Sequence, residues 1–433
     1  MTSIAASAGS PAVREWRENW PIVFTALLGN LLLSLPVLSM GAYFEPLERQ
    51  FGWTRAESSI GVSLYAFVGA VLAPVIGIML DKWGARRMAI PGIVLTGLLY
   101  ALFATNNGSV AYWIALWLLL SAANQLMITM VWSAAVSDVF FAGRGLALGV
   151  TFCGNGLAAV VGPTLSNYLI EHVGWQLAYV WTGLGVGGLV ATVAWFMLFD
   201  RHERARRGMA PAATASAVLT GLSVREGVRS ATFVKLIIAI FMAFFFTMGL
   251  VPHLIPILQG TGLVRDTAVW VASVLGIAMI VGKLGIGWLA DRIHAKLLLA
   301  LCCGMPAIAC AMFLVSAGSL VIPLIAVVVL GIAIGSQLTT TIYLSTRYFG
   351  MRCFGKLFSF IGSALALASA LAPWAGGQIF DMMNSYAVLL TAGIPVSLLS
   401  SLLILSLGPY PTFDEPAAEE PAFNGGAPAT ALR

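Results

Sequence analysis

Two ionisable side chains lie inside long apolar segments of this sequence, where they could act on a charged solute. Lys283 lies in the segment 267–290 and His253 in the segment 231–259. Ionisable groups are costly inside a hydrocarbon layer, so they usually serve binding or proton transfer there. A lysine can neutralise a carboxylate, and a histidine can carry a proton near neutral pH. Two alternatives stay open: Lys283 could reach the membrane interface with its ammonium, and His253 could be a neutral hydrogen-bonding residue.

Neutral polar and aromatic side chains at similar depth could orient the same solute. Each of the polar ones could instead bridge two helices, and each aromatic one could anchor a helix at an interface. The candidates for substrate contact, besides the two ionisable residues, are Asn30, Tyr65, Asn124, Asn155, Gln337 and Tyr343. Glycines in the same segments are expected to allow close helix packing; they are Gly154, Gly156, Gly282 and Gly285.

Acidic residues are placed differently, because none of the 18 Asp and Glu residues lies in the middle of an apolar segment. A cationic solute would need such a buried carboxylate as its counter-charge, so the pattern favours an anionic solute. The four histidines show no paired metal-ligand spacing, the five cysteines show no CxxC spacing, and no phosphate-binding P-loop is present. We therefore expect no metal, no cofactor and no ATP-driven pump.

The elements that must position these residues are helices within a membrane. Apolar residues make up 59% of the chain and charged residues 9%, whereas a soluble domain is about one quarter charged. A spanning helix needs about 20 apolar residues, and lipid offers backbone groups no hydrogen-bond partner, so each long apolar run is predicted to be helical. The twelve predicted segments are 20–43, 58–81, 88–105, 110–137, 144–170, 176–198, 231–259, 267–290, 297–317, 320–346, 355–380 and 386–407.

The longest polar stretch divides these segments into two sets of six. It forms a predicted cytoplasmic linker, 199–230, between an N-terminal half at 20–198 and a C-terminal half at 231–407. The ends of the chain, 1–19 and 408–433, are predicted to be disordered because the tail is rich in Pro, Ala, Glu and Gly and the start of the chain has a similar composition.

The distribution of Lys and Arg predicts the orientation. With the N-terminus placed in the cytoplasm, all 23 of these residues fall on the cytoplasmic side except Arg49, Arg55, Arg265 and Lys283. Cytoplasmic loops carry this excess of positive charge. Both termini are therefore predicted to be cytoplasmic.

Three features recur 210 residues apart and indicate a duplicated six-helix unit. The pattern Gly-x-x-x-Asp begins at residues 77 and 287, a glycine opens the segments at 145 and 355, and a proline lies at 163 and 373. Two related halves joined by a linker are typical of secondary transporters, whose substrate site lies between the halves near the membrane midplane.

The chain resembles the major facilitator superfamily over residues 20–407. The stretch 77–87, GIMLDKWGARR, is similar to the loop signature of that superfamily, and 287–292, GWLADR, is similar to its weaker second copy. Four shorter motifs are similar to the monocarboxylate and oxalate–formate porters: FGWTR at 51–55, RGLALG at 144–149, HLIP at 253–256 and RYFG at 347–350.

This resemblance implies an all-α fold of twelve transmembrane helices in two pseudo-symmetric halves, and transport of small organic anions. It supports Lys283 as the anion site, because that branch carries Arg or Lys at the matching position. It also implies that the two loop signatures form a latch between the halves on the cytoplasmic side. The latch residues are Gly77, Asp81, Gly84, Arg86, Arg87, Asp291 and Arg292.

We therefore expect a monomeric multi-pass protein of the bacterial inner membrane that carries a monocarboxylate-type anion by alternating access, with proton symport as the expected coupling. An enzyme and a nucleic-acid partner are not expected. Two alternatives stay open. One is an efflux antiporter of the same fold for drugs or metabolites, and the other is an anion exchanger or uniporter.

Overall fold

The computed structural model describes residues 11–199, 222–290, 292–316, 318–350 and 353–411, without the side chains of residues 70, 73, 74, 81, 287, 288, 290, 354 and 355. Within these ranges every regular element is a helix. In chain order the elements are α1 (Pro11–Phe51), α2 (Arg55–Trp83), α3 (Ala85–Leu102), η1 (Phe103–Thr105), α4 (Val110–Gln125), α5 (Thr129–Ser137), α6 (Arg144–Val180), η2 (Trp181–Val186), α7 (Gly187–Met197), α9 (Val224–Arg229), α10 (Ala231–Gly260), α11 (Arg265–Ala290), α12 (Ala295–Leu314), α13 (Val321–Phe349), α14 (Phe354–Met383) and α15 (Ala387–Leu405).

Ten helical stretches of the described chain are long and apolar enough to cross a membrane. One of them, Arg144–Met197, is 54 residues long and is interrupted at Gly174, whose backbone (φ 83°, ψ 162°) leaves the helical region. Glycine adopts a positive φ at little cost, so this stretch forms two arms that correspond to the predicted segments 144–170 and 176–198. The predicted segment 58–81 lies on α2, which is not among the ten, and its crossing stays a prediction.

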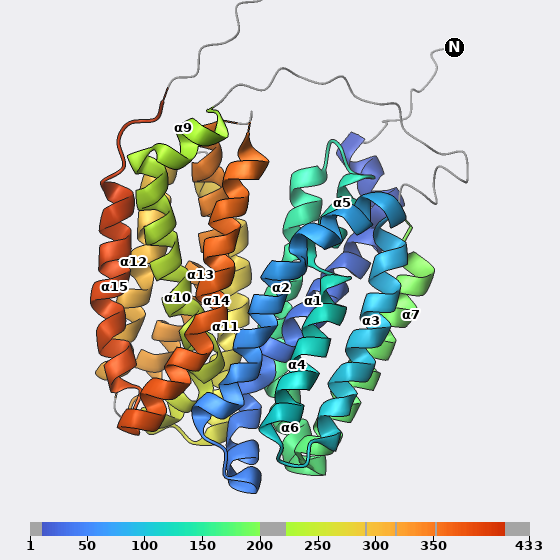
Figure 1. Ribbon diagram of the computed structural model, residues 1–433, viewed down its shortest axis with the longest axis vertical. Coiled ribbons are helices and arrows are strands. Elements are labelled where there is room, and N and C mark those ends of the chain that lie inside the picture. Colours follow the sequence, from blue (N-terminus) through green and yellow to red (C-terminus); the bar gives the residue numbers. More distant parts are fainter. Residues whose placement is uncertain (1–10, 200–221, 291, 317, 351–352, 412–433) are drawn as a thin grey trace, which may run out of the picture.

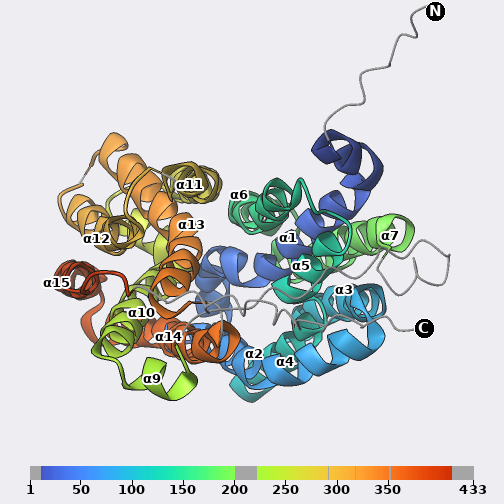
Figure 2. The same cartoon turned by 90° about the horizontal axis from the view of Figure 1, so that it is seen from above.

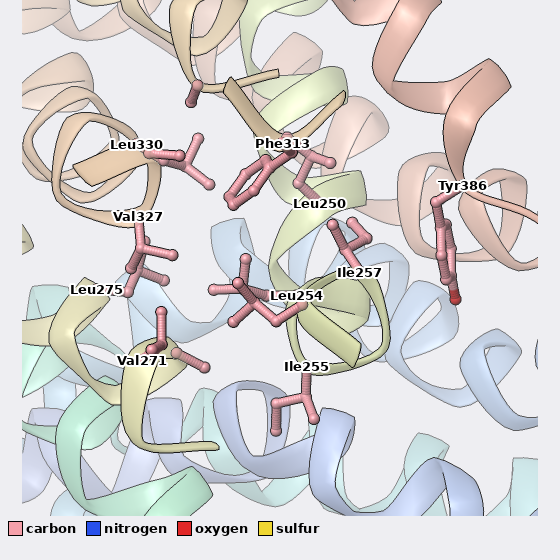
Figure 3. Packing of buried hydrophobic residues seen from close by; sticks show 14 of the residues in the cluster. Leu250, Leu254, Ile255, Ile257, Val271, Leu275, Phe313, Val327, Leu330 and Tyr386 are labelled. Carbon is pink, nitrogen blue, oxygen red and sulfur yellow. The ribbon is translucent and has the colours of Figure 1, made fainter. Parts of the chain in front are cut away.

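The helices gather into two halves. Helices α1 to α7 form one half and α9 to α15 form the other, as Figures 1 and 2 show from two directions. Each half has its own clusters of buried apolar side chains, and Figure 3 shows one from the second half, around Leu254 and Phe313. The most extensive contacts between the halves join α2 to α14 and α6 to α11.

Two ends of the bundle are distinguished below. The α9 end carries α9, the end of α7 and the start of α10 (Figure 1). The Arg55 end carries the turn between α1 and α2 and the starts of α11 and α15.

The first helix begins earlier than predicted. Residues 11–19 were expected to be disordered, but α1 starts at Pro11, a residue type that suits the first position of a helix. Its first turns are held by contacts with distant chain: Glu15 accepts hydrogen bonds from the backbone N–H groups of residues 141–143, and Trp16 packs edge-on against Phe140 at 5.3 Å. Tertiary contacts, which local composition does not reveal, order this segment.

Glycines allow α6 and α11 to cross closely between the halves. A Cβ atom on Gly276 would lie 2.2 Å from the carbonyl oxygen of Gly156, and one on Gly156 would lie 2.8 Å from the carbonyl oxygen of Gly276. The expected packing role also holds for Gly154 and Gly282, each crowded by backbone of a neighbouring helix. It does not hold for Gly285, which has open space around it.

Candidate functional site

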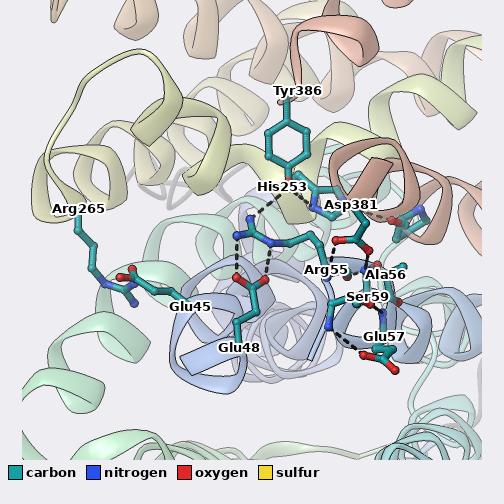
Figure 4. A network of polar contacts seen from close by, with 12 residues as sticks. Glu45, Glu48, Arg55, Ala56, Glu57, Ser59, His253, Arg265, Asp381 and Tyr386 are labelled. Atoms are coloured by element: carbon teal, nitrogen blue, oxygen red, sulfur yellow. Dashed lines mark hydrogen bonds and ion pairs between the residues drawn. The ribbon is translucent and has the colours of Figure 1, made fainter. Parts of the chain in front are cut away.

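An ionic network joins the two halves at the Arg55 end (Figure 4). The Arg55 guanidinium forms an ion pair with Glu48, with 2.9 Å between Nη2 and Oε2. It also donates from Nη1 to the hydroxyl of Tyr386, in the other half, at 3.2 Å. The guanidinium lies over the rings of Phe380 and Phe44, at 4.5 and 5.4 Å from their centres. Arg55 is therefore held by both halves at once.

His253 continues this network and is fully buried. Its Nε2 lies 2.9 Å from the carbonyl oxygen of Pro373, which can only accept, so Nε2 carries the proton. Its Nδ1 therefore accepts from the hydroxyl of Tyr386 at 2.9 Å. The ring also stacks on Phe44 of the first half at 5.2 Å. The sequence made His253 a candidate for substrate contact and left open whether it carries a proton or is a neutral hydrogen-bonding residue. In this conformation both ring nitrogens are occupied within the network.

A carboxylate from the second half caps α2. Asp381 in α14 accepts hydrogen bonds from the backbone N–H groups of Arg55 and Ala56 at 2.9 and 2.8 Å. These N–H groups lie in the first turn of α2, where the helix has no partner for them and carries partial positive charge. The hydroxyl of Ser63 accepts a further inter-half hydrogen bond from the N–H of Trp374 at 3.0 Å.

A second arginine joins α11 to the first half. Arg265 forms an ion pair with Glu45 of α1 and donates to the side-chain oxygen of Asn167 in α6 at 2.9 Å. It also donates to the carbonyl oxygen of Ala42 at 2.7 Å. Asn167 in turn donates to Asp266 at 3.3 Å. The two arginines thus fasten the halves together on both sides of the Arg55 end.

A cavity of about 220 Å³ lies between the halves, next to this network. Pro373 belongs to both, since it lines the cavity and accepts the hydrogen bond from His253. Nearly all of the lining surface is apolar. The lining residues come from α1, α2, α10, α11, α13 and α14, and they are Val37, Leu38, Val62, Tyr65, Ala66, Met248, Val251, Pro252, Met279, Ile334, Ser369 and Pro373.

Tyr65 is the predicted site residue that lines this cavity, and its hydroxyl is fixed by neighbours. It donates to the carbonyl oxygen of Leu33 at 3.2 Å and accepts from the side-chain amide of Asn124 at 2.9 Å. The oxygen of that amide accepts from Thr96 at 2.7 Å. Asn124 therefore positions Tyr65 and makes no contact with the cavity itself.

Lys283 lies where α11 faces α6 of the other half. Its ammonium donates to the carbonyl oxygen of Phe152 at 3.1 Å and lies 5.6 Å from the centre of the Phe152 ring. Lys283 follows the cavity-lining Met279 by four residues, so both lie on neighbouring parts of one helix face, about 6 Å apart along the axis. Among the described residues no carboxylate pairs with this ammonium.

The remaining predicted contact residues lie outside the cavity lining. The side chain of Asn30 is shared between its own helix and Thr129, a helix-bridging role. Tyr343 accepts from Arg347 at 2.9 Å. Two amides keep an atom without a hydrogen bond within the described chain: the Oδ1 of Asn155 and the Nε2 of Gln337. The structure thus brings Tyr65 to the cavity wall, and these four residues are not part of that wall.

The predicted latch residues are described in part, since Asp291 and the side chain of Asp81 lie outside the described residues. Gly84 ends α2 and precedes α3 with a φ of 80°, which requires glycine. Arg86 donates to the carbonyl oxygens of Leu198 and Trp195, at the end of α7 in the same half.

Three further latch residues complete that set. Gly77 has one side-chain neighbour near its missing Cβ, Met130 at 3.7 Å. Arg87 and Arg292 are both exposed. A latch between the halves at the α9 end stays a prediction.

The sequence did not single out most of the network at the Arg55 end. Arg55, Glu48, Asp381 and Tyr386 all occur near segment ends, where charges are common. Two signals were present. The motif FGWTR at 51–55 ends in Arg55. The side with few cations carries Arg49, Arg55 and Arg265, and two of these three bind across the halves.

Two helical halves that enclose a cavity and meet through polar contacts at one end define a membrane transporter. The chain matches the family model of the Major Facilitator Superfamily over residues 22–373 and 236–431, and it belongs to that superfamily. It is a multi-pass membrane protein of this class.

Two named relatives match this chain at low sequence identity. The chain is 26% identical to Monocarboxylate transporter 13 of Bos taurus over 282 residues, which are 63% of this chain and 62% of that protein, so the match spans less than two thirds of the bovine relative. It is 25% identical to the Rattus norvegicus protein of the same name over 318 residues, 71% of this chain and 70% of that protein.

A solved structure shares the fold. The crystal structure of a D-xylose-proton symporter superposes with a TM-score of 0.70 at 12% sequence identity, covering 90% of this chain and 98% of that chain. At this identity the likeness concerns the fold alone.

Proposed function

We propose that this protein transports small organic anions of the monocarboxylate type by alternating access, coupled to protons, across the bacterial inner membrane. The observation that carries the proposal is Lys283. It is a cationic side chain at the contact between the halves, one helical turn from a residue that lines the cavity. Ionisable groups at such a depth usually serve function.

Two further observations support an anionic substrate. None of the described residues that line the cavity is acidic, so a cationic solute, as expected of many drug antiporters, would find no counter-charge among them. The relatives with 26% and 25% identity are named as monocarboxylate transporters. A proton taken up with the anion would make the net charge carried across the membrane zero, which is the reason we favour symport.

The predicted orientation in the membrane also indicates which conformation of the transport cycle the structure represents. The excess of Lys and Arg around the α9 end supports a cytoplasmic location for that end. The Arg55 end, which the two arginine networks hold together, would then face outward. We infer that the structure is closed toward the outside. The predicted latch at the α9 end would form in the opposite conformation, in which the network around Arg55 must break.

Uptake of labelled carboxylates into proteoliposomes, with and without an inward proton gradient, tests the proposal. We expect uptake by the wild type, its stimulation by the gradient, at least a tenfold loss in Lys283→Gln and partial retention in Lys283→Arg. Lys235→Gln is a matched control, because Lys235 also donates to a backbone carbonyl, that of Ser406, but within one half at 3.3 Å. Uptake by Lys283→Gln at the wild-type rate would refute the anion-site assignment.

A further inference from the structure

We propose that the cavity selects monocarboxylates with a bulky apolar body, such as an aryl or branched alkyl group, over hydroxylated acids and sugar acids. This inference rests on the proposed function and names the substrate class for the same site. It is carried by the composition of the cavity wall, by the cavity's size and by its position relative to Lys283.

The cavity wall offers a solute almost no hydrogen bonds. Of the twelve lining residues, Tyr65 and Ser369 alone have a polar side-chain atom. The hydroxyl proton of Tyr65 is already donated to Leu33, and Asn124 donates to its oxygen. Of these two hydroxyls, that of Ser369 makes no side-chain hydrogen bond among the described residues, so it is the one polar side chain of the wall that is free to donate to or accept from a solute. Burying a polar group without a hydrogen-bond partner is unfavourable, and a sugar or sugar acid would bring several such groups.

The size of the cavity fits a ring or a branched chain. An engineered apolar cavity of about 150 Å³ stays dry and binds benzene. This cavity, at about 220 Å³, is larger and can hold a ring with a few more atoms. Met248 and Met279 contribute flexible thioether side chains, which adapt to irregular shapes and make favourable contacts with aromatic rings.

The positive charge of Lys283 lies at one side of the cavity. Lys283 is one turn beyond Met279 in the direction of the α9 end, about 6 Å further along α11. An acid whose apolar body fills the cavity can therefore place its carboxylate near this ammonium. The part of the wall formed by Pro252 and Pro373 adjoins the buried His253 and offers the apolar body a surface of uncharged side chains. Substrates of this geometry have one carboxylate at one end of an apolar group.

A competition panel tests the selectivity in proteoliposomes that contain the full-length protein. Uptake of labelled phenylacetate is measured against unlabelled phenylacetate, 4-methylpentanoate, lactate, gluconate and glucuronate. We expect the first two acids to compete at concentrations at least tenfold lower than the other three. Equal or better competition by lactate, gluconate or glucuronate would overturn the selectivity while leaving a carboxylate transporter. Failure of the folded wild type to move any carboxylate would overturn the proposed function as well.

Two variants connect the selectivity to the cavity. Ala66→Leu narrows the cavity and should reduce phenylacetate uptake at least fivefold, with a smaller effect on acetate. Met279→Ala widens it and should shift the preference toward longer acids. Ala115→Leu, an exposed position in α4, is the control for the added side chain. Size-exclusion profiles verify that each variant is folded. The same phenylacetate-to-acetate ratio in all four proteins would show that this cavity does not set selectivity.

Discussion

The carboxylate of Asp381 accepts a hydrogen bond from the backbone N–H of Arg55 at 2.9 Å, and this contact joins α14 of one half to the first turn of α2 in the other. Its second oxygen accepts from the next N–H along the helix at 2.8 Å. The carboxylate thus occupies the positive end of the α2 dipole. The side chain of Arg55 meanwhile binds Glu48 and Tyr386, so a single residue connects α1, α2 and α15.

Asp381→Asn should weaken closure of the Arg55 end. The amide keeps one acceptor oxygen but loses the negative charge, and hydrogen bonds to charged groups are worth about 1.5–3 kcal/mol. We expect a larger fraction of molecules open at this end. Spin labels at the exposed Asn107 and Val264, in a background without the five cysteines, measure the distance between the halves by double electron–electron resonance. An unchanged distance distribution would mean that the cap does not contribute to closure.

Arg55→Gln should reduce transport more than the double variant Arg55→Gln with Glu48→Gln. The single variant leaves Glu48 without its partner in a site where 11% of the Arg55 side chain and 24% of the Glu48 side chain are exposed. Removing one partner of a poorly solvated pair costs more than removing both. We expect at least a tenfold loss of uptake in the single variant and a partial recovery in the double variant.

A control variant at Arg49 shows whether uptake depends on the Arg55–Glu48 pair or on any positive charge at the Arg55 end. Arg49 lies nearby with 79% of its side chain exposed, and exposed ion pairs contribute little. Arg49→Gln should therefore retain nearly full uptake. A double variant that transports no better than Arg55→Gln alone would argue against coupling between Arg55 and Glu48.

The helices were predictable because apolar length determines them. Long apolar runs form helices in lipid, and each predicted segment overlaps a helix of the structure. The bounds differ in places: 110–137 is divided between α4 and α5, and 297–317 extends beyond the end of α12. The start of α1 was not predictable, because Glu15 and Trp16 are ordered by residues more than 100 positions away. The break at Gly174 was expected only as a gap between two segments, whereas the chain passes through it without a loop.

The candidate site was predictable only in part, for a similar reason. The sequence identified Tyr65 and Lys283 by residue type and depth, and the structure places the first in the cavity wall and the second one turn from it. It also identified His253, but its partners, Pro373 and Tyr386, lie more than 100 residues away in the chain. Which buried polar group serves a ligand and which serves a neighbour depends on such contacts, and a single sequence does not contain them.

His253→Gln should slow transport without removing its stimulation by a proton gradient. His253 acts in the structure as a link between Tyr386 and Pro373, and Gln can also donate and accept but with a different shape. We expect a several-fold lower rate and an unchanged ratio of uptake with and without the gradient. Tyr386→Phe, which removes the hydroxyl from the same link, should behave alike. Loss of the gradient effect in His253→Gln alone would instead assign proton transfer to this residue.

Gly276→Ala should separate α6 from α11 and impair transport. The added Cβ would lie 2.2 Å from the carbonyl oxygen of Gly156 and 2.6 Å from the backbone N of Val160, and backbone cannot move aside as a flexible side chain can. Overpacking of this kind costs about 1–3 kcal/mol, and it displaces the helix that carries Lys283. Thermal unfolding in detergent and uptake in proteoliposomes measure the two effects. Gly285→Ala is the control on the same helix, where a Cβ meets nothing within 4 Å. If both variants unfold and transport as the wild type does, the halves do not depend on this close crossing, and the position of Lys283 must be fixed by other contacts.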